Sequence, residues 1–161
     1  MINGKNIRNV ISIIAVSMLL VACPQVHDDD VYFEPTVDQI LNITKNGIWE
    51  ITYFYDSGHE ETGNFSGYSF NFNEDGTLVA VNGNTEVTGT WSVFEIDDLP
   101  SDDDGSMTEN VNKLSLFFVT PDEFLDLNKE WDIIYITENH IEVSHENGGN
   151  DQINYLTFNM L

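Results

Sequence analysis

The sequence predicts an all-β protein in which eight antiparallel strands close into an up-and-down barrel after one short N-terminal helix. Short segments of alternating apolar and polar residues recur from residue 49 onward, and clusters of Asn, Asp and Gly separate them. The chain has 161 residues, 41% of them hydrophobic and 12% aromatic, which suits one globular core. A meander of eight strands has exposed edges unless it closes, so these observations favour a barrel.

The predicted elements follow one another along the chain. Over residues 35–44, apolar residues at helical spacing and Pro35 at a permitted start predict a short helix that ends before Gly47. A second helical turn is predicted over residues 121–127, with Thr120 as its cap. The eight predicted strands cover residues 49–55, 68–72, 78–81, 86–96, 114–118, 131–137, 141–144 and 155–160.

Alternation along these strands predicts which side chains fill the barrel. In the first strand, Trp49, Ile51, Tyr53 and Tyr55 are expected to share one face. The candidate ligand-binding interior consists of Trp49, Ile51, Tyr68, Phe70, Phe72, Trp91, Val93, Leu116, Trp131 and Ile133, with Leu114, Ile141 and Val143 beside them. Such aromatic walls can stack on a ligand, or they can interlock and leave no space.

The charge balance excludes several classes of partner. Asp and Glu total 28 against five Lys and Arg, which gives a formal net charge of −23. A chain this acidic repels nucleic-acid phosphates and anionic headgroups. Intrinsic disorder is disfavoured as well, because ten Phe, six Tyr and three Trp are far more than a solvated acidic chain carries.

The N-terminus has the order of an export signal. Lys5 and Arg8 precede an apolar stretch of about 11 residues, which is shorter than the roughly 20 residues that a membrane-spanning helix needs. The residues Leu20-Val21-Ala22-Cys23 resemble the lipobox of bacterial lipoproteins, which implies that residues 1–22 are a cleaved signal peptide and that Cys23 is lipidated. The alternative is a conventional signal peptide with an incidental cysteine.

Residues 23–34 are predicted to form a tether to the domain at residues 35–161. Pro24 follows the cysteine where inner-membrane retention would favour an aspartate, so the lipobox resemblance implies an outer-membrane lipoprotein. The run Asp28-Asp29-Asp30 resembles the acidic export tags of surface-exposed lipoproteins, and it equally suits a solvated spacer.

Two patterns around the tryptophans concern the barrel itself. Gly47-Ile48-Trp49 resembles the Gly-x-Trp signature of lipocalins, and the hairpin order of residues 47–161 resembles the lipocalin-like domains of secreted bacterial lipoproteins. The arginine that packs on the lipocalin indole has no counterpart, since Arg8 is the last arginine. Trp49, Trp91 and Trp131 are 42 and 40 residues apart, which indicates either weak internal symmetry or coincidence of core packing.

No combination of residues in the sequence predicts catalysis, so we expect a protein that is not an enzyme. His140 and His145 are an odd number apart on one strand and should point to opposite faces, as solvated side chains. The acidic segment with Asp97, Asp98, Asp102, Asp103 and Asp104 is a candidate calcium site, although it lacks EF-hand spacing, which favours a solvated loop instead.

Two functions remain open from the sequence. The first is a membrane-anchored carrier that binds a small apolar or amphipathic ligand in the barrel. The second is a packed barrel that contacts a protein or glycan partner at the cell surface. The sequence leaves the oligomeric state open.

Overall fold

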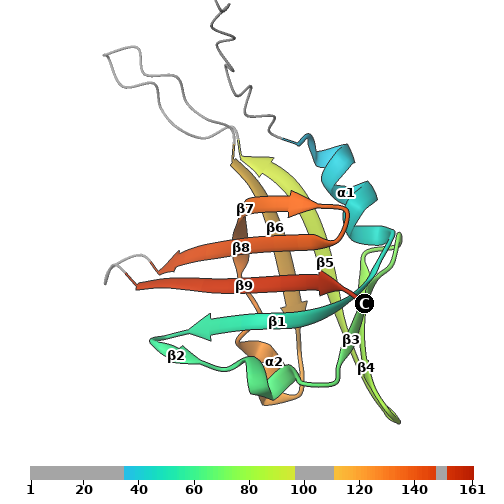
Figure 1. The fold of residues 1–161 in the computed structure, drawn as a ribbon, viewed down its shortest axis with the longest axis vertical. Coiled ribbons are helices and arrows are strands. Elements are labelled where there is room, and N and C mark those ends of the chain that lie inside the picture. Colours follow the sequence, from blue (N-terminus) through green and yellow to red (C-terminus); the bar gives the residue numbers. More distant parts are fainter. Residues whose placement is uncertain (1–34, 97–110, 148–151) are drawn as a thin grey trace, which may run out of the picture. The chain divides into compact units, whose positions relative to one another are not determined.

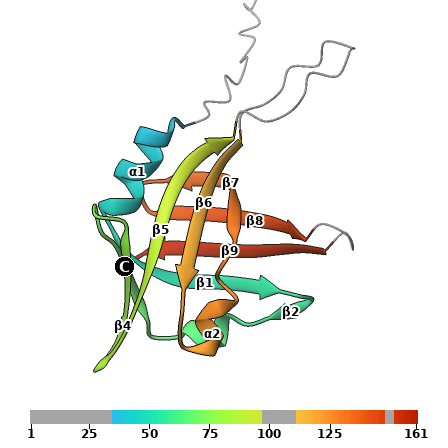
Figure 2. The same ribbon diagram turned by 180° about the vertical axis from the view of Figure 1, so that it is seen from behind.

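The computed structural model describes residues 35–96, 111–147 and 152–161, and it confirms the predicted all-β fold as a closed antiparallel barrel of eight strands (Figures 1 and 2). The strands are β1 (Ile48–Asp56), β2 (His59–Glu60), β3 (Ser69–Phe72), β4 (Thr77–Asn82), β5 (Thr85–Ile96), β6 (Val111–Phe118), β7 (Glu130–Thr137), β8 (His140–Asn147) and β9 (Gln152–Met160). The short β2 turns back and pairs antiparallel with the end of β1. A 3-10 helix, η1 (Thr62–Phe65), follows before β3 begins. None of the helices in these described segments is long and apolar enough to cross a membrane.

Pairing between the first and last strands closes the barrel. β1 pairs antiparallel with β3, each strand from β3 to β9 pairs antiparallel with the next, and β9 returns to pair with β1. The aligned residues of β1 and β9 run from Trp49 and Met160 to Tyr55 and Tyr155. Closure leaves no long free edge on these eight strands, which removes the row of unpaired backbone groups that an open sheet exposes.

A β-bulge in β1 overturns the prediction that Tyr53 and Tyr55 share a face with Trp49 and Ile51. Ile51 aligns with Phe158 of β9, and the next aligned pair is Tyr53 with Thr157, so Thr52 is an extra residue in the strand. An extra residue reverses the alternation beyond it. Phe54 therefore points inward and is fully buried, whereas Tyr53 is 41% exposed.

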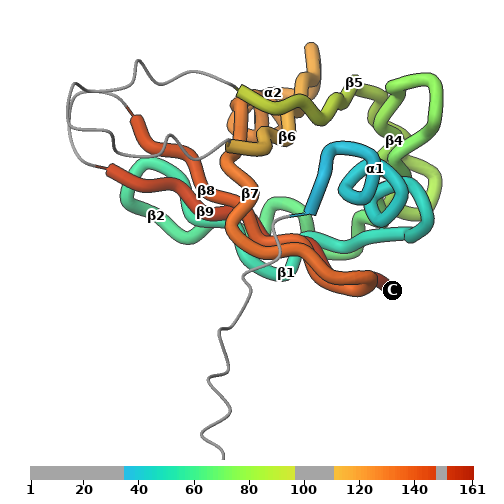
Figure 3. Tube along the Cα trace, turned by 90° about the horizontal axis from the view of Figure 1, so that it is seen from above, coloured from blue at the N-terminus to red at the C-terminus, as the bar shows by residue number. Residues whose placement is uncertain are grey.

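The predicted N-terminal helix is confirmed as α1 (Val37–Lys45), which begins after the N-cap Thr36. Thr36 and Gln39 form a capping box, in which the Gln39 side chain accepts a 2.9 Å hydrogen bond from the Thr36 backbone N–H. Ile40 is buried, and α1 contacts β3 and β5. Seen from above, α1 lies within the ring of strands, so it covers the barrel end at which β1 begins (Figure 3).

The opposite end of the barrel is covered by η1 and by α2 (Asp122–Leu125), which lie together in Figure 1. Phe65 of η1 and Phe124 of α2 are buried, and their ring centroids are 5.3 Å apart. The helical turn at α2 was predicted, but its predicted cap was wrong. The N-cap is Pro121, which follows a cis peptide bond and makes no side-chain capping bond, so Thr120 lies one residue too early.

The turn between β3 and β4 contains Gly76, whose φ of +83° favours glycine. The Asp75 carboxylate accepts hydrogen bonds from the Thr77 hydroxyl at 2.7 Å and from the Thr77 N–H at 2.9 Å. These bonds stabilise the charged form of Asp75 and so lower its pKa below the usual value of 3.8. The bond from the Thr77 hydroxyl has the larger effect.

Close packing at Gly89 predicts a stability change. Gly89 lies in β5 facing the interior, and a Cβ there would lie 2.5 Å from both the Phe117 carbonyl oxygen and Cδ1 of Phe118. We expect Gly89→Ala to lower the free energy of unfolding by about 1–3 kcal/mol through overpacking, measured by urea denaturation. Gly63→Ala is the control, because a Cβ at Gly63 meets nothing within 4 Å. Equal effects of the two substitutions would contradict this account of the core.

Candidate functional site

The structure places the sequence-predicted interior residues inside the barrel. Trp49, Phe70, Phe72, Leu116 and Trp131 are at most 2% exposed, and Ile51 and Trp91 are 6% exposed. Tyr68, Val93 and Ile133 are half-buried and pack against this core. Leu114, Ile141 and Val143 are buried as predicted.

The interior also contains five phenylalanines that were not predicted to lie there. They are Phe54, Phe65, Phe118, Phe124 and Phe158. Phe118 and Phe158 lie in predicted strands with inward alternation, so the sequence carried their signal. Phe54 points inward only because of the bulge. Phe65 and Phe124 belong to short helical turns, where alternation gives no information about the core.

The interior rings contact one another from one barrel end to the other. Phe118 and Phe124 have centroids 4.9 Å apart, Phe124 and Phe70 6.2 Å, Phe70 and Phe158 5.6 Å, Phe158 and Phe72 5.6 Å, and Phe72 and Trp91 5.2 Å. Most of these pairs meet edge to face, the arrangement that the ring quadrupoles favour. This chain of rings occupies the axis that a carrier would leave for a ligand.

The three tryptophans share one structural role. Each indole N–H donates to a backbone carbonyl: Trp49 to Thr44 at 2.9 Å, Trp91 to Asn73 at 3.0 Å, and Trp131 to Leu127 at 3.0 Å. The acceptors lie at the end of α1, in the β3–β4 turn and just after α2. Each bond ties a connecting segment to the barrel wall and satisfies a polar group that would otherwise be buried unpaired.

The Gly-x-Trp motif has a direct steric explanation. A Cβ on Gly47 would lie 2.6 Å from Cε of Met160 and 2.9 Å from Cε2 of Trp49. Only glycine leaves room for the indole to fold back toward the end of α1, where its N–H bonds the Thr44 carbonyl.

A buried polar cluster interrupts the aromatic interior at the end covered by η1 and α2, where we place the strongest candidate for a polar binding site. Lys129, just before β7, forms an ion pair with Asp56 of β1, with Nζ 2.9 Å from Oδ1. Both side chains are largely buried, at 14% and 11% exposure. Lys129 also donates to the Asp126 carbonyl, and its Nζ lies 5.4 Å from the Trp131 ring centroid.

Asn154 and His145 continue this cluster on β9 and β8. Asn154 is fully buried, and its Oδ1 accepts a 3.1 Å hydrogen bond from the Ser57 N–H. Its Nδ2 has no hydrogen-bond partner. His145 aligns with Asn154, and its ring centroid lies 6.1 Å from that of Trp131. The cluster thus holds a buried amide donor able to bond an acceptor, beside a lysine already neutralised by a carboxylate.

Asp56, Lys129 and Asn154 were not predicted, because residues so far apart in sequence form one cluster only after the barrel closes. A single signal was available. Asn154 begins the alternating inward series that continues with Leu156 and Phe158, where a polar residue is unusual, whereas Asp56 points inward only because of the bulge.

The two histidines of β8 do face opposite sides, but neither is simply solvated. His140 has Nδ1 2.7 Å from the Asn159 Oδ1, and His145 has Nδ1 2.9 Å from the Glu130 carbonyl oxygen.

Within residues 35–96, 111–147 and 152–161, no group of three or more His, Cys, Asp or Glu side chains is arranged to hold a metal ion. Cys23 and the candidate calcium ligands Asp97, Asp98, Asp102, Asp103 and Asp104 lie outside the described residues, so both sites stay predictions.

Breaking the buried ion pair should be costly. We expect Lys129→Met to lower the free energy of unfolding by about 3 kcal/mol, because it leaves the Asp56 carboxylate buried without a cation. The double variant Asp56→Asn, Lys129→Met should recover much of that loss. Lys45→Met is the matched control, since Lys45 pairs at 3.5 Å with Glu74, whose side chain is 87% exposed, and we expect a loss below about 1 kcal/mol. Similar losses for Lys129→Met and Lys45→Met in urea denaturation would contradict the buried pair.

Comparison with known proteins yields no match at a significant level: no protein family, no curated protein and no solved structure is similar to this chain. The functional argument therefore rests on the geometry of the barrel and on the residues of its interior and surface.

Proposed function

We propose that this protein is a membrane-anchored lipoprotein whose packed barrel serves as a rigid module that binds a partner through its outer surface. The observation that carries the proposal is the continuous chain of ring contacts from Phe118 to Trp91 along the interior. Elements at both ends add to it, because α1 lies over one and Phe65 and Phe124 fill the other. Eight strands enclose a space that side chains alone can fill.

The proposal gives the barrel no catalytic role and places the chain at the outer membrane. Support for the anchor comes from the lipobox-like residues Leu20-Val21-Ala22-Cys23 and from the short apolar stretch before them. Two or more acyl chains hold a protein stably on a bilayer, since each buried methylene contributes about 0.8 kcal/mol. The partner-binding module would then stand on the tether formed by residues 23–34.

A carrier function is the second candidate, and one observation favours it. The unpaired Nδ2 of Asn154 is a buried donor that the carbonyl, hydroxyl or carboxylate oxygen of an amphipathic ligand would satisfy. In that case the polar group of the ligand would sit beside Asn154 and Lys129, and its apolar part would have to displace rings of the core.

Ligand titration separates the two candidates. We expect N-phenyl-1-naphthylamine to leave both the tryptophan fluorescence and the melting temperature of the full chain unchanged, because Trp49, Trp91 and Trp131 are buried among core side chains that the probe would have to displace. Leu116→Ala is the positive control, since it should open an apolar cavity at a cost of about 2–5 kcal/mol and gain stability from added benzene. Saturable quenching of the wild-type tryptophans by the naphthylamine would reject the packed module and favour the carrier.

Mass spectrometry of the mature N-terminus tests the anchor. After expression in a bacterial host that processes lipoproteins, we expect cleavage before Cys23 and a mass increase from acyl chains on that residue. Cys23→Ser should abolish both the acyl mass and the partition into the membrane fraction. An unmodified Cys23, or cleavage at another position, would reject lipidation.

A further inference from the structure

Tyrosines from three strands gather on the outside of the barrel, where register shifts in β1 before Tyr53 and in β7 before Tyr135 turn these side chains outward. Tyr53 and Tyr55 of β1 point outward, and Tyr55 aligns directly with Tyr155 of β9. Tyr53 aligns with Thr157, Thr157 with Glu142 of β8, and Glu142 with Tyr135 of β7. We define the tyrosine face as Tyr53, Tyr55, Tyr135 and Tyr155 with the outward carboxylates of Glu50 and Glu142.

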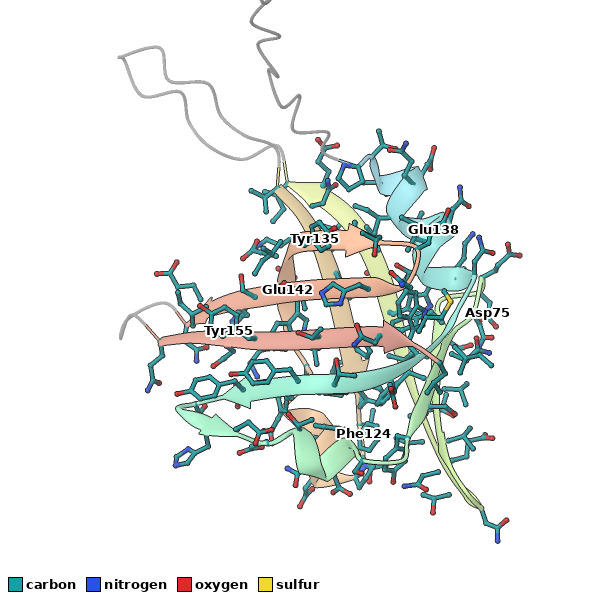
Figure 4. The ribbon with its side chains drawn as sticks, in the orientation of Figure 1. Asp75, Phe124, Tyr135, Glu138, Glu142 and Tyr155 are labelled. Carbon is teal, nitrogen blue, oxygen red and sulfur yellow. The ribbon has the colours of Figure 1, made fainter. Side chains whose placement is uncertain are left out.

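Figure 4 shows Tyr135, Glu142 and Tyr155 on the same outer side of β7, β8 and β9. Neighbouring strands are about 4.8 Å apart, so Tyr53 and Tyr135, three strands apart, are separated by about 14 Å. An extended peptide of about four residues covers that span. The face is therefore large enough to bind several consecutive side chains of a partner.

Two rings of this face are exposed, and that of Tyr135 also contacts the His140 ring, with centroids 5.8 Å apart. Tyr53 is 41% and Tyr135 is 54% exposed, while Tyr55 and Tyr155 are half-buried. Tyrosine is enriched at interfaces because its stiff ring offers contact area and a polar group at a small entropic cost.

The charges around the face indicate what kind of partner it suits. All three lysines in the described residues already pair with carboxylates: Lys45 with Glu74, Lys113 with Asp132, and Lys129 with Asp56. Glu50 is exposed, and Glu142 has only His140 nearby, with Nε2 3.8 Å from its carboxylate. The face thus combines electron-rich rings with carboxylates that no lysine neutralises, which is complementary to a cation.

We propose that the tyrosine face binds a cationic segment of a partner protein, with arginine or lysine side chains over the tyrosine rings and paired with Glu50 and Glu142. This inference rests on the proposed surface-binding function and assigns it a surface and a class of partner. Arginine suits the face best, because its planar guanidinium stacks on an aromatic ring and bonds a carboxylate at the same time.

The opposite side of the barrel lacks this combination. Outward positions of β5, which lies four strands from β9 in either direction around the barrel, carry the small polar residues Thr88, Thr90 and Ser92. Glu86 and Glu95 are exposed on β5 without tyrosines beside them. This side supplies matched controls, since it offers similar carboxylates without the rings.

Binding of fluorescently labelled nona-arginine to the full chain, followed by anisotropy, tests the proposal. We expect Tyr53→Ser, Tyr135→Ser to weaken binding about tenfold, because each cation–π contact contributes about 0.5–1 kcal/mol at an exposed site. Phe117→Ser is the control for loss of an exposed ring, since Phe117 of β6 is 55% exposed and lies outside the face. Circular dichroism confirms that each variant keeps the barrel.

A second pair of variants separates a specific face from general attraction to an acidic protein. Glu50→Gln, Glu142→Gln should weaken nona-arginine binding more than Glu86→Gln, Glu95→Gln, although both remove two charges. Equal weakening by the two charge pairs, or no effect of the tyrosine substitutions, would overturn the proposal. Binding of a neutral oligosaccharide such as maltohexaose at the same tyrosines, independent of salt and without nona-arginine binding, would instead assign the face to glycans.

These outcomes are distinct from those that test the proposed function. If the apolar probe leaves the tryptophans unquenched and nona-arginine fails to discriminate among the variants, the packed module stands and only its cationic partner is rejected. If the probe enters the interior, the packed module fails whatever the peptide does.

Discussion

Closure of the sheet between β1 and β9 is the constraint on which the rest of the structure depends. The two strands bring residues 49–55 beside residues 155–160, so this pairing is a long-range contact that spans nearly the whole domain. Without it, the edges of β1 and β9 would be free, and the rings of Trp49, Phe54 and Phe158 would face water. Core and sheet are therefore coupled, because the same pairing protects the backbone edges and encloses the aromatic side chains.

The bulge within this pairing determines the chemistry of both sides of the wall. Because Thr52 is an extra residue in β1, Phe54 points into the core, and Tyr53 and Tyr55 point toward solvent. The reverse arrangement would bury phenolic hydroxyls, which need partners, and expose a phenylalanine, which gains nothing from water. The bulge thus reconciles a full apolar interior with a polar aromatic exterior on one strand.

The order of the elements could be predicted from the sequence because it depends on local signals. Alternating segments predicted all eight strands of the barrel, and Pro35 and the turn clusters indicated where elements begin and reverse. The bulge could not be predicted in the same way, since Trp49, Ile51, Tyr53 and Tyr55 are all apolar or aromatic and fit an unbroken alternation. In such a strand, only the partner strand decides where the register shifts. The polar cluster of Asp56, Lys129 and Asn154 was missed for a related reason, because it combines residues from distant parts of the chain.

The packed interior supports our proposal that this barrel acts through its outer surface. A core in which rings meet edge to face gains its stability from close contact, and a ligand could enter only by separating those rings. The outer side chains of β1, β7, β8 and β9 are under no such constraint, since the barrel keeps its shape whichever residues point to solvent. Rings on a rigid wall lose little conformational freedom when a partner binds, so the same packing that argues against an internal ligand favours recognition at the tyrosine face.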